Sequence, residues 1–182
     1  MMNTQELYQK TIVFATKKHL EKGQTVPDSN LPYVVHLSNV AMEIMLAYKN
    51  SKKSNINLTI TLALLHDTLE DTNTTFNEIT DHFGIEVAEG VFALTKNSEL
   101  PKDQQIKDSL KRILKLKKEV WCVKLADRIT NLQQPPGNWD KYKIRSYLEE
   151  AKQISEALKG ANNYLEKRLK HAIDEYEKYI ID

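Results

Sequence analysis

Residues 64–72, LLHDTLEDT, decide how this chain is interpreted, because an apolar run leads directly into closely spaced polar residues. On a helix, His66 and Glu70 lie four positions apart on one face, and Asp67 and Asp71 do the same. So many acidic groups beside an apolar run destabilise a fold unless a cation neutralises them. Taken alone, the stretch is equally compatible with a solvated acidic helix end.

The rest of the chain has the same helical periodicity. Five glycines and five prolines among 182 residues leave few places to end a helix, and apolar residues recur at three- and four-residue spacing. Residues 75–78, TFNE, predict a capping box that opens a short helix, with Gly84 as its stop. Irregular segments are expected at 23–32, 96–102 and 134–139. We therefore expect an all-α fold, a bundle of about nine to ten helices without a sheet.

Length and composition describe an ordinary globular protein. We expect one domain over residues 1–182, which is long enough for a sizeable core. Lys and Arg number 26 against 25 acidic residues, so no binding to a nucleic-acid polymer is expected. The single cysteine, Cys122, excludes an internal disulfide and suits a reducing cytoplasm.

The start of the chain predicts no secretory signal, because it lacks a basic segment followed by an apolar one. Apolar runs such as residues 62–65 are far too short to cross a bilayer, so no membrane partner is expected. These features favour a cytoplasmic protein. The sequence carries no signal for an oligomeric state.

Two further stretches place polar side chains within apolar helical patterns. In residues 123–131, VKLADRITN, Asp127 and Asn131 share a helix face and Lys124 lies one turn before Asp127. An internal salt bridge of Asp127 with Lys124 or Arg128 is the structural alternative. In residues 32–37, PYVVHL, His36 lies where a proline-marked loop enters a helix. A lone histidine is usually structural, so His36 becomes significant only in combination with the other stretches.

Together these stretches resemble the HD superfamily of phosphohydrolases, whose hallmark is H…HD…D. The similarity is closest to the hydrolase domain of RelA/SpoT-type alarmone enzymes and to free-standing small alarmone hydrolases. It runs from the Pro32-Tyr33 step through residues 64–72, 83–88 and 94–96 to Asn131. The resemblance implies a hydrolase domain alone, without a synthetase domain.

The resemblance also implies that one divalent cation is ligated by His36, His66, Asp67 and Asp127. Two imidazoles and two carboxylates leave open positions on a six-coordinate ion, which suits Mn²⁺ better than a closed zinc site. The family likewise points to Mn²⁺.

Glu70 and Asp71 match the family's Glu-Asp pair, which is expected to orient or deprotonate the attacking water and to pass a proton to the leaving group. Asn131 and Tyr147 are expected to contact the nucleotide. Lysines that could neutralise phosphate are Lys96, Lys124 and Lys143. The common alternative for each lysine is a solvated helix position.

The sequence departs from the family pattern at one place. Gly23-Gln24 is followed by Thr25-Val26, where the family often has an Arg-Lys pair facing the base and phosphates. Specificity for guanosine therefore cannot be carried over from the resemblance. No site role is assigned to the remaining histidines, which are His19, His82 and His171.

The expected function is Mn²⁺-dependent removal of the 3′-diphosphate from (p)ppGpp-type alarmones, giving GDP or GTP and pyrophosphate. One alternative keeps the metal chemistry but acts on an adenosine alarmone or another phosphorylated nucleotide. Another is a nucleotide-binding regulator without turnover, although a sensor does not need the Glu70-Asp71 pair for proton transfer. A purely helical interaction module is the third alternative.

Overall fold

The structure, a computed structural model, describes residues 2–49 and 55–181. These residues form eleven helices, joined by loops with one isolated β-bridge between Thr25 and Pro32, and contain no strand. The helices are α1 (Thr4–Glu21), α2 (Val34–Tyr48), α3 (Ile56–Leu65), α4 (Thr68–Asp71), α5 (Phe76–Phe83), α6 (Ile85–Leu94), α7 (Lys102–Ile113), α8 (Lys118–Asn131), α9 (Lys141–Ala157), α10 (Asn163–Tyr176) and α11 (Lys178–Ile181). Nine helices have eight or more residues and two have four, so the all-α expectation is confirmed. None of the described helices is both long and apolar enough to cross a membrane.

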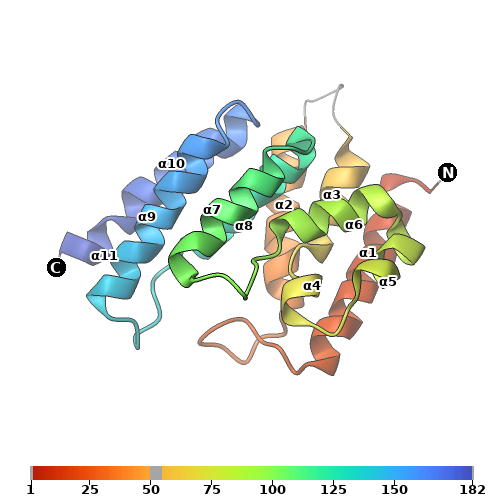
Figure 1. Ribbon diagram of the computed structural model, residues 1–182, viewed down its shortest axis with the longest axis horizontal. Helices are drawn as coiled ribbons and strands as arrows, with labels where there is room; N and C mark the ends of the chain where they lie inside the picture. The colour runs from red at the N-terminus through yellow and green to blue at the C-terminus, as the bar shows by residue number, and fades with distance from the viewer. Residues whose placement is uncertain (1, 50–54, 182) are drawn as a thin grey trace.

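Helices α3 and α8 form the centre of the bundle. Every residue of α3 from Leu58 to Leu65 is buried, because the helix packs against α1, α2, α6 and α8. Helix α8 packs in turn against α2, α3 and α10. In Figure 1, α9 to α11 lie on one side, α1 and α5 lie on the other, and α7 and α8 lie between them. The elements that carry His36, His66-Asp67 and Asp127 are therefore packed directly against one another.

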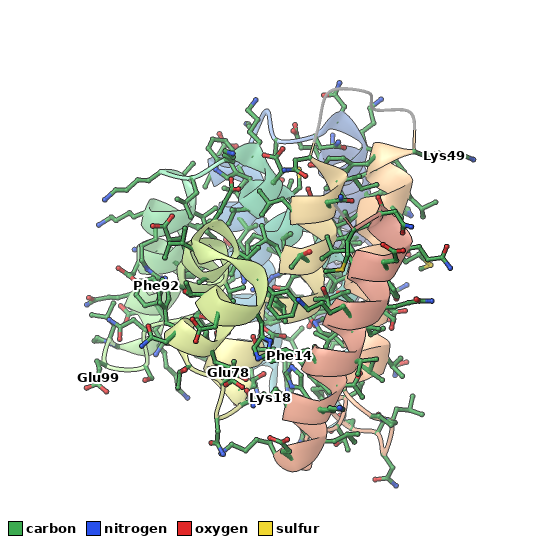
Figure 2. All side chains as sticks on the ribbon, turned by 90° about the vertical axis from the view of Figure 1, so that its right-hand side faces the viewer. Phe14, Lys18, Lys49, Glu78, Phe92 and Glu99 are labelled. Carbon is green, nitrogen blue, oxygen red and sulfur yellow. The ribbon has the colours of Figure 1, made fainter. Side chains whose placement is uncertain are left out.

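Side-chain caps fix the starts of several helices, among them α1 and α5. Asn3 forms a complete capping box at the start of α1. At α5, Thr75 accepts a hydrogen bond from the Glu78 backbone N–H, and Gly84 ends the helix with a φ of 91°. The Glu78 carboxylate lies 2.7 Å from Lys18 Nζ on α1, so the expected capping box at 75–78 forms only in part (Figure 2). This ion pair ties α5 to α1.

Residues 64–72 do not form the single helix on which His66 and Glu70 would share a face, because the helix is interrupted at His66-Asp67. Helix α3 ends at Leu65 and α4 begins at Thr68. The Thr68 hydroxyl donates to the Leu65 carbonyl at 2.6 Å, and His66 Nδ1 lies 2.8 Å from the Ala63 carbonyl. Side chains therefore pair with two of the terminal carbonyls of α3, those of Ala63 and Leu65.

Candidate active site

The four expected metal ligands converge at the centre of the bundle. His66 Nε2 lies 3.0 Å from Asp67 Oδ2 and 3.3 Å from His36 Nε2. Asp127 Oδ1 lies 3.6 Å from the Nε2 atoms of both histidines. One ligand atom each of His36, His66 and Asp67 lies within 4.8 Å of the others. This mixed set of imidazole nitrogens and carboxylate oxygens suits a divalent transition-metal ion.

The orientation of His66 supports metal binding. Its side chain is almost fully buried, and Nδ1 lies 2.8 Å from the Ala63 carbonyl at the end of α3. Because a carbonyl only accepts, Nδ1 carries the hydrogen and Nε2 faces the cluster. Metal-ligating histidines usually donate the N–H of their second ring nitrogen to a carboxylate, a backbone carbonyl or a water, and His66 has such a carbonyl partner.

The electrostatics of the cluster favour positive charge. Burial opposes ionisation of Asp67 and Asp127, yet the pKa of Asp67 lies below its usual range because His66 is adjacent. Lys124 and the two imidazoles likewise lower the pKa of Asp127 despite its burial. Burial opposes a charge on His66 too, but the two carboxylates raise its pKa well above the ordinary value. A group of charges that favours an imidazolium also favours a bound cation.

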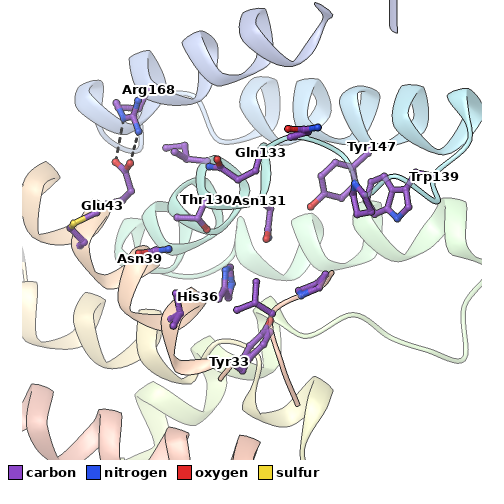
Figure 3. Close-up of a pocket in the computed structure, with 17 residues that line it drawn as sticks. Tyr33, His36, Asn39, Glu43, Thr130, Asn131, Gln133, Trp139, Tyr147 and Arg168 are labelled. Atoms are coloured by element: carbon purple, nitrogen blue, oxygen red, sulfur yellow. Dashed lines mark hydrogen bonds and ion pairs between the residues drawn. The ribbon is translucent and has the colours of Figure 1, made fainter. Parts of the chain in front are cut away.

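A cavity of about 520 Å³ opens beside this cluster, and His36 is part of its wall. Figure 3 shows Tyr33 and His36 on one side, with Asn131 of α8 facing them. Trp139 and Tyr147 lie at one end, with their ring centroids 5.2 Å apart. The volume is within the range of pockets that enclose small organic ligands.

The profile of the HD domain family matches residues 12–162 of the chain. The chain belongs to the HD domain family. It is 34% identical over 164 residues to guanosine-3′,5′-bis(diphosphate) 3′-pyrophosphohydrolase MESH1 of Xenopus tropicalis, covering 87% of this chain and 88% of that protein. The corresponding human protein is 33% identical with the same coverage.

A solved structure with a similar fold is described as a metazoan ortholog of SpoT that hydrolyses ppGpp and plays a role in starvation responses. Its TM-score is 0.77 at 26% identity, covering 93% of this chain and 94% of the other. These similarities confirm the resemblance found in the sequence and the assignment to metal-dependent phosphohydrolases. The HD domain family implies a divalent metal, and the residues described above provide a cluster that could hold it.

Glu70 and Asp71, the two acidic residues that follow the His-Asp pair, accept hydrogen bonds from different partners. The Glu70 carboxylate accepts a hydrogen bond of 2.8 Å from the Lys96 backbone N–H and lies 3.5 Å from Lys96 Nζ. Asp71 Oδ2 accepts a hydrogen bond of 2.7 Å from Gln24 Nε2. Burial and the nearby charge of Asp67 raise the pKa of Asp71. Separate partners give the two carboxylates different environments, which suits different roles in proton transfer.

The structure adds residues to which sequence reasoning assigned no role. The Tyr33 hydroxyl donates to Asp67 Oδ2 at 2.5 Å, and its ring stacks on His19 with centroids 4.6 Å apart. His19 Nδ1 in turn lies 2.5 Å from Gln24 Oε1, so the Gln24 amide joins His19 to Asp71. Tyr33 and Gln24 could have been found from the sequence, because the dipeptides Pro32-Tyr33 and Gly23-Gln24 belong to the family pattern, but there they supported only the resemblance.

Of the residues expected to contact substrate, Asn131 and Tyr147 line the cavity and the three lysines do not. Asn131 lines the cavity and donates to Asp127 Oδ1 at 2.6 Å, and Tyr147 also lines it. Lys124 is buried and lies 3.1 Å from Asp127 Oδ2, as the salt-bridge alternative predicted. Lys143 is exposed, and its Nζ lies 4.2 Å from the centre of the Trp139 ring. Lys96, described above, pairs with Glu70.

The loop that departs from the family pattern also reaches the cavity. Thr25 forms the backbone bridge with Pro32, and the Val26 N–H donates to the Leu31 carbonyl at 2.9 Å. Val26 and Pro27 line the cavity. The segment where the family often has an Arg-Lys pair therefore contributes apolar residues, Val26 and Pro27, to the cavity wall here.

Proposed function

We propose that this HD domain hydrolyses the 3′-diphosphate of guanosine 3′,5′-bis(diphosphate) and its pentaphosphate analogue, giving GDP or GTP and pyrophosphate. One observation carries the proposal: His36 belongs both to the cluster whose ligand atoms lie within 4.8 Å and to the wall of the 520 Å³ cavity. A nucleotide in the cavity would thus have a phosphate within reach of the cluster. The names of the MESH1 relatives support this substrate class.

We propose Mn²⁺ as the metal, held by His36, His66, Asp67 and Asp127. When bound, a divalent cation supplies a Lewis acid for phosphate oxygens and a water molecule of lowered pKa. The residues around the ligands keep them in place. Tyr33 holds Asp67 through its hydroxyl, and Lys124 and Asn131 each hold one oxygen of Asp127.

In this reaction, a water oxygen adds to the phosphorus that is bonded to the 3′ oxygen. The bond from that phosphorus to the 3′ oxygen breaks, pyrophosphate leaves, and the 3′ oxygen takes up a proton. Asp71 is suited to donate this proton because burial and Asp67 raise its pKa. Glu70, fixed by the Lys96 backbone, is suited to orient the water and accept its proton.

The same proposal bears on the cellular compartment and on the domain organisation. We place the enzyme in the cytoplasm, where nucleotide substrates are found and where the buried free thiol of Cys122 stays reduced. We treat residues 1–182 as a single domain, because the buried apolar residues that are described form one continuous core.

The test is a panel of phosphorylated nucleotides with Mn²⁺, including guanosine and adenosine 3′,5′-bis(diphosphates), scored by product identity. We expect pyrophosphate and a nucleoside 3′-hydroxyl from the guanosine compound. Asp67→Ala and Asp127→Ala should each lose nearly all bound Mn²⁺ and activity, because a lost ligand weakens both charge balance and geometry. Asp174→Ala, on the exposed face of α10, is the matched control.

Two results would contradict the proposal. Mn²⁺ binding without pyrophosphate release from any nucleotide would favour the regulator without turnover. Full Mn²⁺ occupancy in Asp67→Ala or Asp127→Ala would remove that residue from the ligand set.

A further inference from the structure

The end of the cavity opposite Trp139 and Tyr147 is formed by an ion pair between α2 and α10 (Figure 3). Arg168 Nη2 donates to Glu43 Oε1 at 2.6 Å, and Nε donates to Oε2 at 3.4 Å. Both residues line the cavity whose wall includes His36, and Glu43 follows His36 by two turns on α2. This Glu43–Arg168 pair has no part in the chemistry described above.

The two partners are unequally exposed. The Glu43 side chain is 7% exposed and the Arg168 side chain is 41% exposed. A buried carboxylate needs a fixed partner, so Glu43 anchors the guanidinium. Arginine has five N–H donors, of which Glu43 takes two. Arg168 is thus held in one place at the cavity while donors remain for a further ligand.

The charges around the cavity distinguish Arg168 from the other basic residues. Of the seventeen described residues that line the cavity, Arg168 alone has a permanent positive charge. The lysines that sequence reasoning favoured for phosphate, Lys96, Lys124 and Lys143, are not among them. A nucleotide with two diphosphates would therefore meet one fixed cationic side chain in the cavity wall besides the metal centre.

The wall of the cavity offers a separate group for each of three parts of such a nucleotide, namely the base, the 3′-diphosphate and the 5′-phosphates. The metal centre lies beside the middle of the cavity, the aromatic pair of Trp139 and Tyr147 lies at one end, and Arg168 lies at the other. Aromatic rings are suited to a planar base. A guanidinium in a fixed orientation is suited to phosphate oxygens, which it can bind through two parallel hydrogen bonds.

We propose that Arg168, positioned by Glu43, binds the 5′-phosphate groups of the nucleotide whose 3′-diphosphate is cleaved. This inference rests on the proposed function and adds the residue that selects 5′-phosphorylated substrates. Arg168 contacts substrate, whereas Glu43 acts through Arg168 as a positioning residue.

The experiment compares guanosine 3′,5′-bis(diphosphate) with guanosine 3′-diphosphate, which has a free 5′ hydroxyl. Arg168→Gln should lower kcat/KM for the first compound by about 10- to 100-fold, mainly through KM, because charge-assisted hydrogen bonds to phosphate are lost. The same variant should leave kcat/KM for the second compound unchanged. Lys170→Gln, at an exposed position on the same helix, is the matched control and should affect neither.

Equal losses with both compounds would overturn the inference and make the Glu43–Arg168 pair a structural link between α2 and α10. Should Arg168→Gln unfold, Arg168→Lys keeps the charge but not the paired donors, and a selective KM increase is still expected. Glu43→Gln should give a smaller increase with the same selectivity, whereas a purely structural role would affect both compounds alike.

Binding without turnover separates this inference from the proposed function. The natural protein should bind GDP more tightly than guanosine, and Arg168→Gln should remove most of that difference in a calorimetric titration. If no nucleotide is hydrolysed but this difference depends on Arg168, the proposed reaction fails and the phosphate site stands. If hydrolysis occurs but GDP binding does not depend on Arg168, the proposed reaction stands and the phosphate site is overturned.

Discussion

Tyr33 lies outside the proposed ligand set but contacts two of its members, Asp67 and His36. Its ring lies between His19 and His36, with centroid distances of 4.6 Å and 5.2 Å. Burial raises the pKa of the Tyr33 hydroxyl, and the negative charge of Asp67 raises it further. The hydroxyl therefore keeps its proton and remains a donor, which fixes the orientation of the Asp67 carboxylate.

Replacing Tyr33 by Phe removes this donor and keeps the ring. We expect the affinity for Mn²⁺ to fall by about 10- to 100-fold, as is usual when a group that orients a metal ligand is lost. Calorimetric titration of the metal-free protein measures the change. Tyr142→Phe is the control, because that side chain is 81% exposed. Unchanged affinity in Tyr33→Phe would show that Asp67 is oriented without the hydroxyl.

Glu70 should separate catalysis from metal binding. Glu70→Gln keeps the size of the side chain and its acceptor for the Lys96 N–H but removes the basic carboxylate. We expect Mn²⁺ binding to be retained and kcat to fall by about 10²-fold or more. Metal content and turnover are measured on the same preparations, with the exposed Glu99→Gln as control. Loss of metal with normal turnover per bound ion would make Glu70 a ligand.

At the scale of the helices, contacts between residues close in the sequence could be predicted from helical spacing, whereas contacts between distant residues could be predicted only where the family resemblance indicated them. Asp127 meets Lys124 and Asn131 at spacings of three and four, so a single helical pattern indicated both contacts. The Tyr33–Asp67 hydrogen bond spans 34 positions, and no local pattern encodes it. It depends on the way α2 packs against α3.

The junction between α3 and α4 illustrates a second limit of sequence reasoning. Helical spacing relates His66 to Glu70 only if residues 64–72 form one helix, and spacing does not show whether side chains will pair with the terminal carbonyls of a shorter helix. Thr68 and His66 do so, and the helix breaks between them. Glu70 therefore lies on the separate short helix α4, where its carboxylate accepts a hydrogen bond from the Lys96 backbone N–H.

Helix α6 supports α3 through a close approach at Gly90. A Cβ atom at this position would lie 2.5 Å from Leu62 Cδ2, and Leu62 is completely buried. Gly90→Val should therefore lower the free energy of unfolding by about 1–3 kcal/mol, since overpacking outweighs the gain in helix propensity. Denaturant unfolding measures the loss. Glu89→Val, one position earlier and exposed, should change stability much less, and equal losses would locate the effect in the helix itself.

On the scale of the whole molecule, the proposed metal centre joins segments that are far apart in the sequence. His36 comes from α2, His66-Asp67 from the end of α3, and Asp127 from α8. These helices contact one another and share the continuous core. A cation held by all four residues would bind the folded chain and not the unfolded one, so its binding free energy should add to the stability of the entire bundle.

This linkage predicts how stability depends on metal and on pH. Without metal, Asp67 and Asp127 raise the pKa of His66 in the folded protein. The resulting stabilisation is fully present below the pKa of His66 in the unfolded chain, near 6.5, and is lost as the pH rises through the pKa of His66 in the folded protein. Both carboxylates stay ionised between about pH 6 and 8, because their pKa values are lowered. Since Mn²⁺ requires neutral imidazoles, it must displace the His66 proton, and its affinity should increase with pH.

At roughly 100 times its Kd, Mn²⁺ should therefore stabilise the fold by about 2.7 kcal/mol. In a chain of this size, that raises Tm by about 5–10 °C. At a fixed Mn²⁺ concentration, the increase in Tm over the metal-free protein should be larger at pH 8 than at pH 6. Asp67→Ala should abolish it, and Asp174→Ala should retain it. An increase that is the same at both pH values would mean that no proton leaves the cluster when the metal binds, and that His66 is already neutral in the metal-free protein.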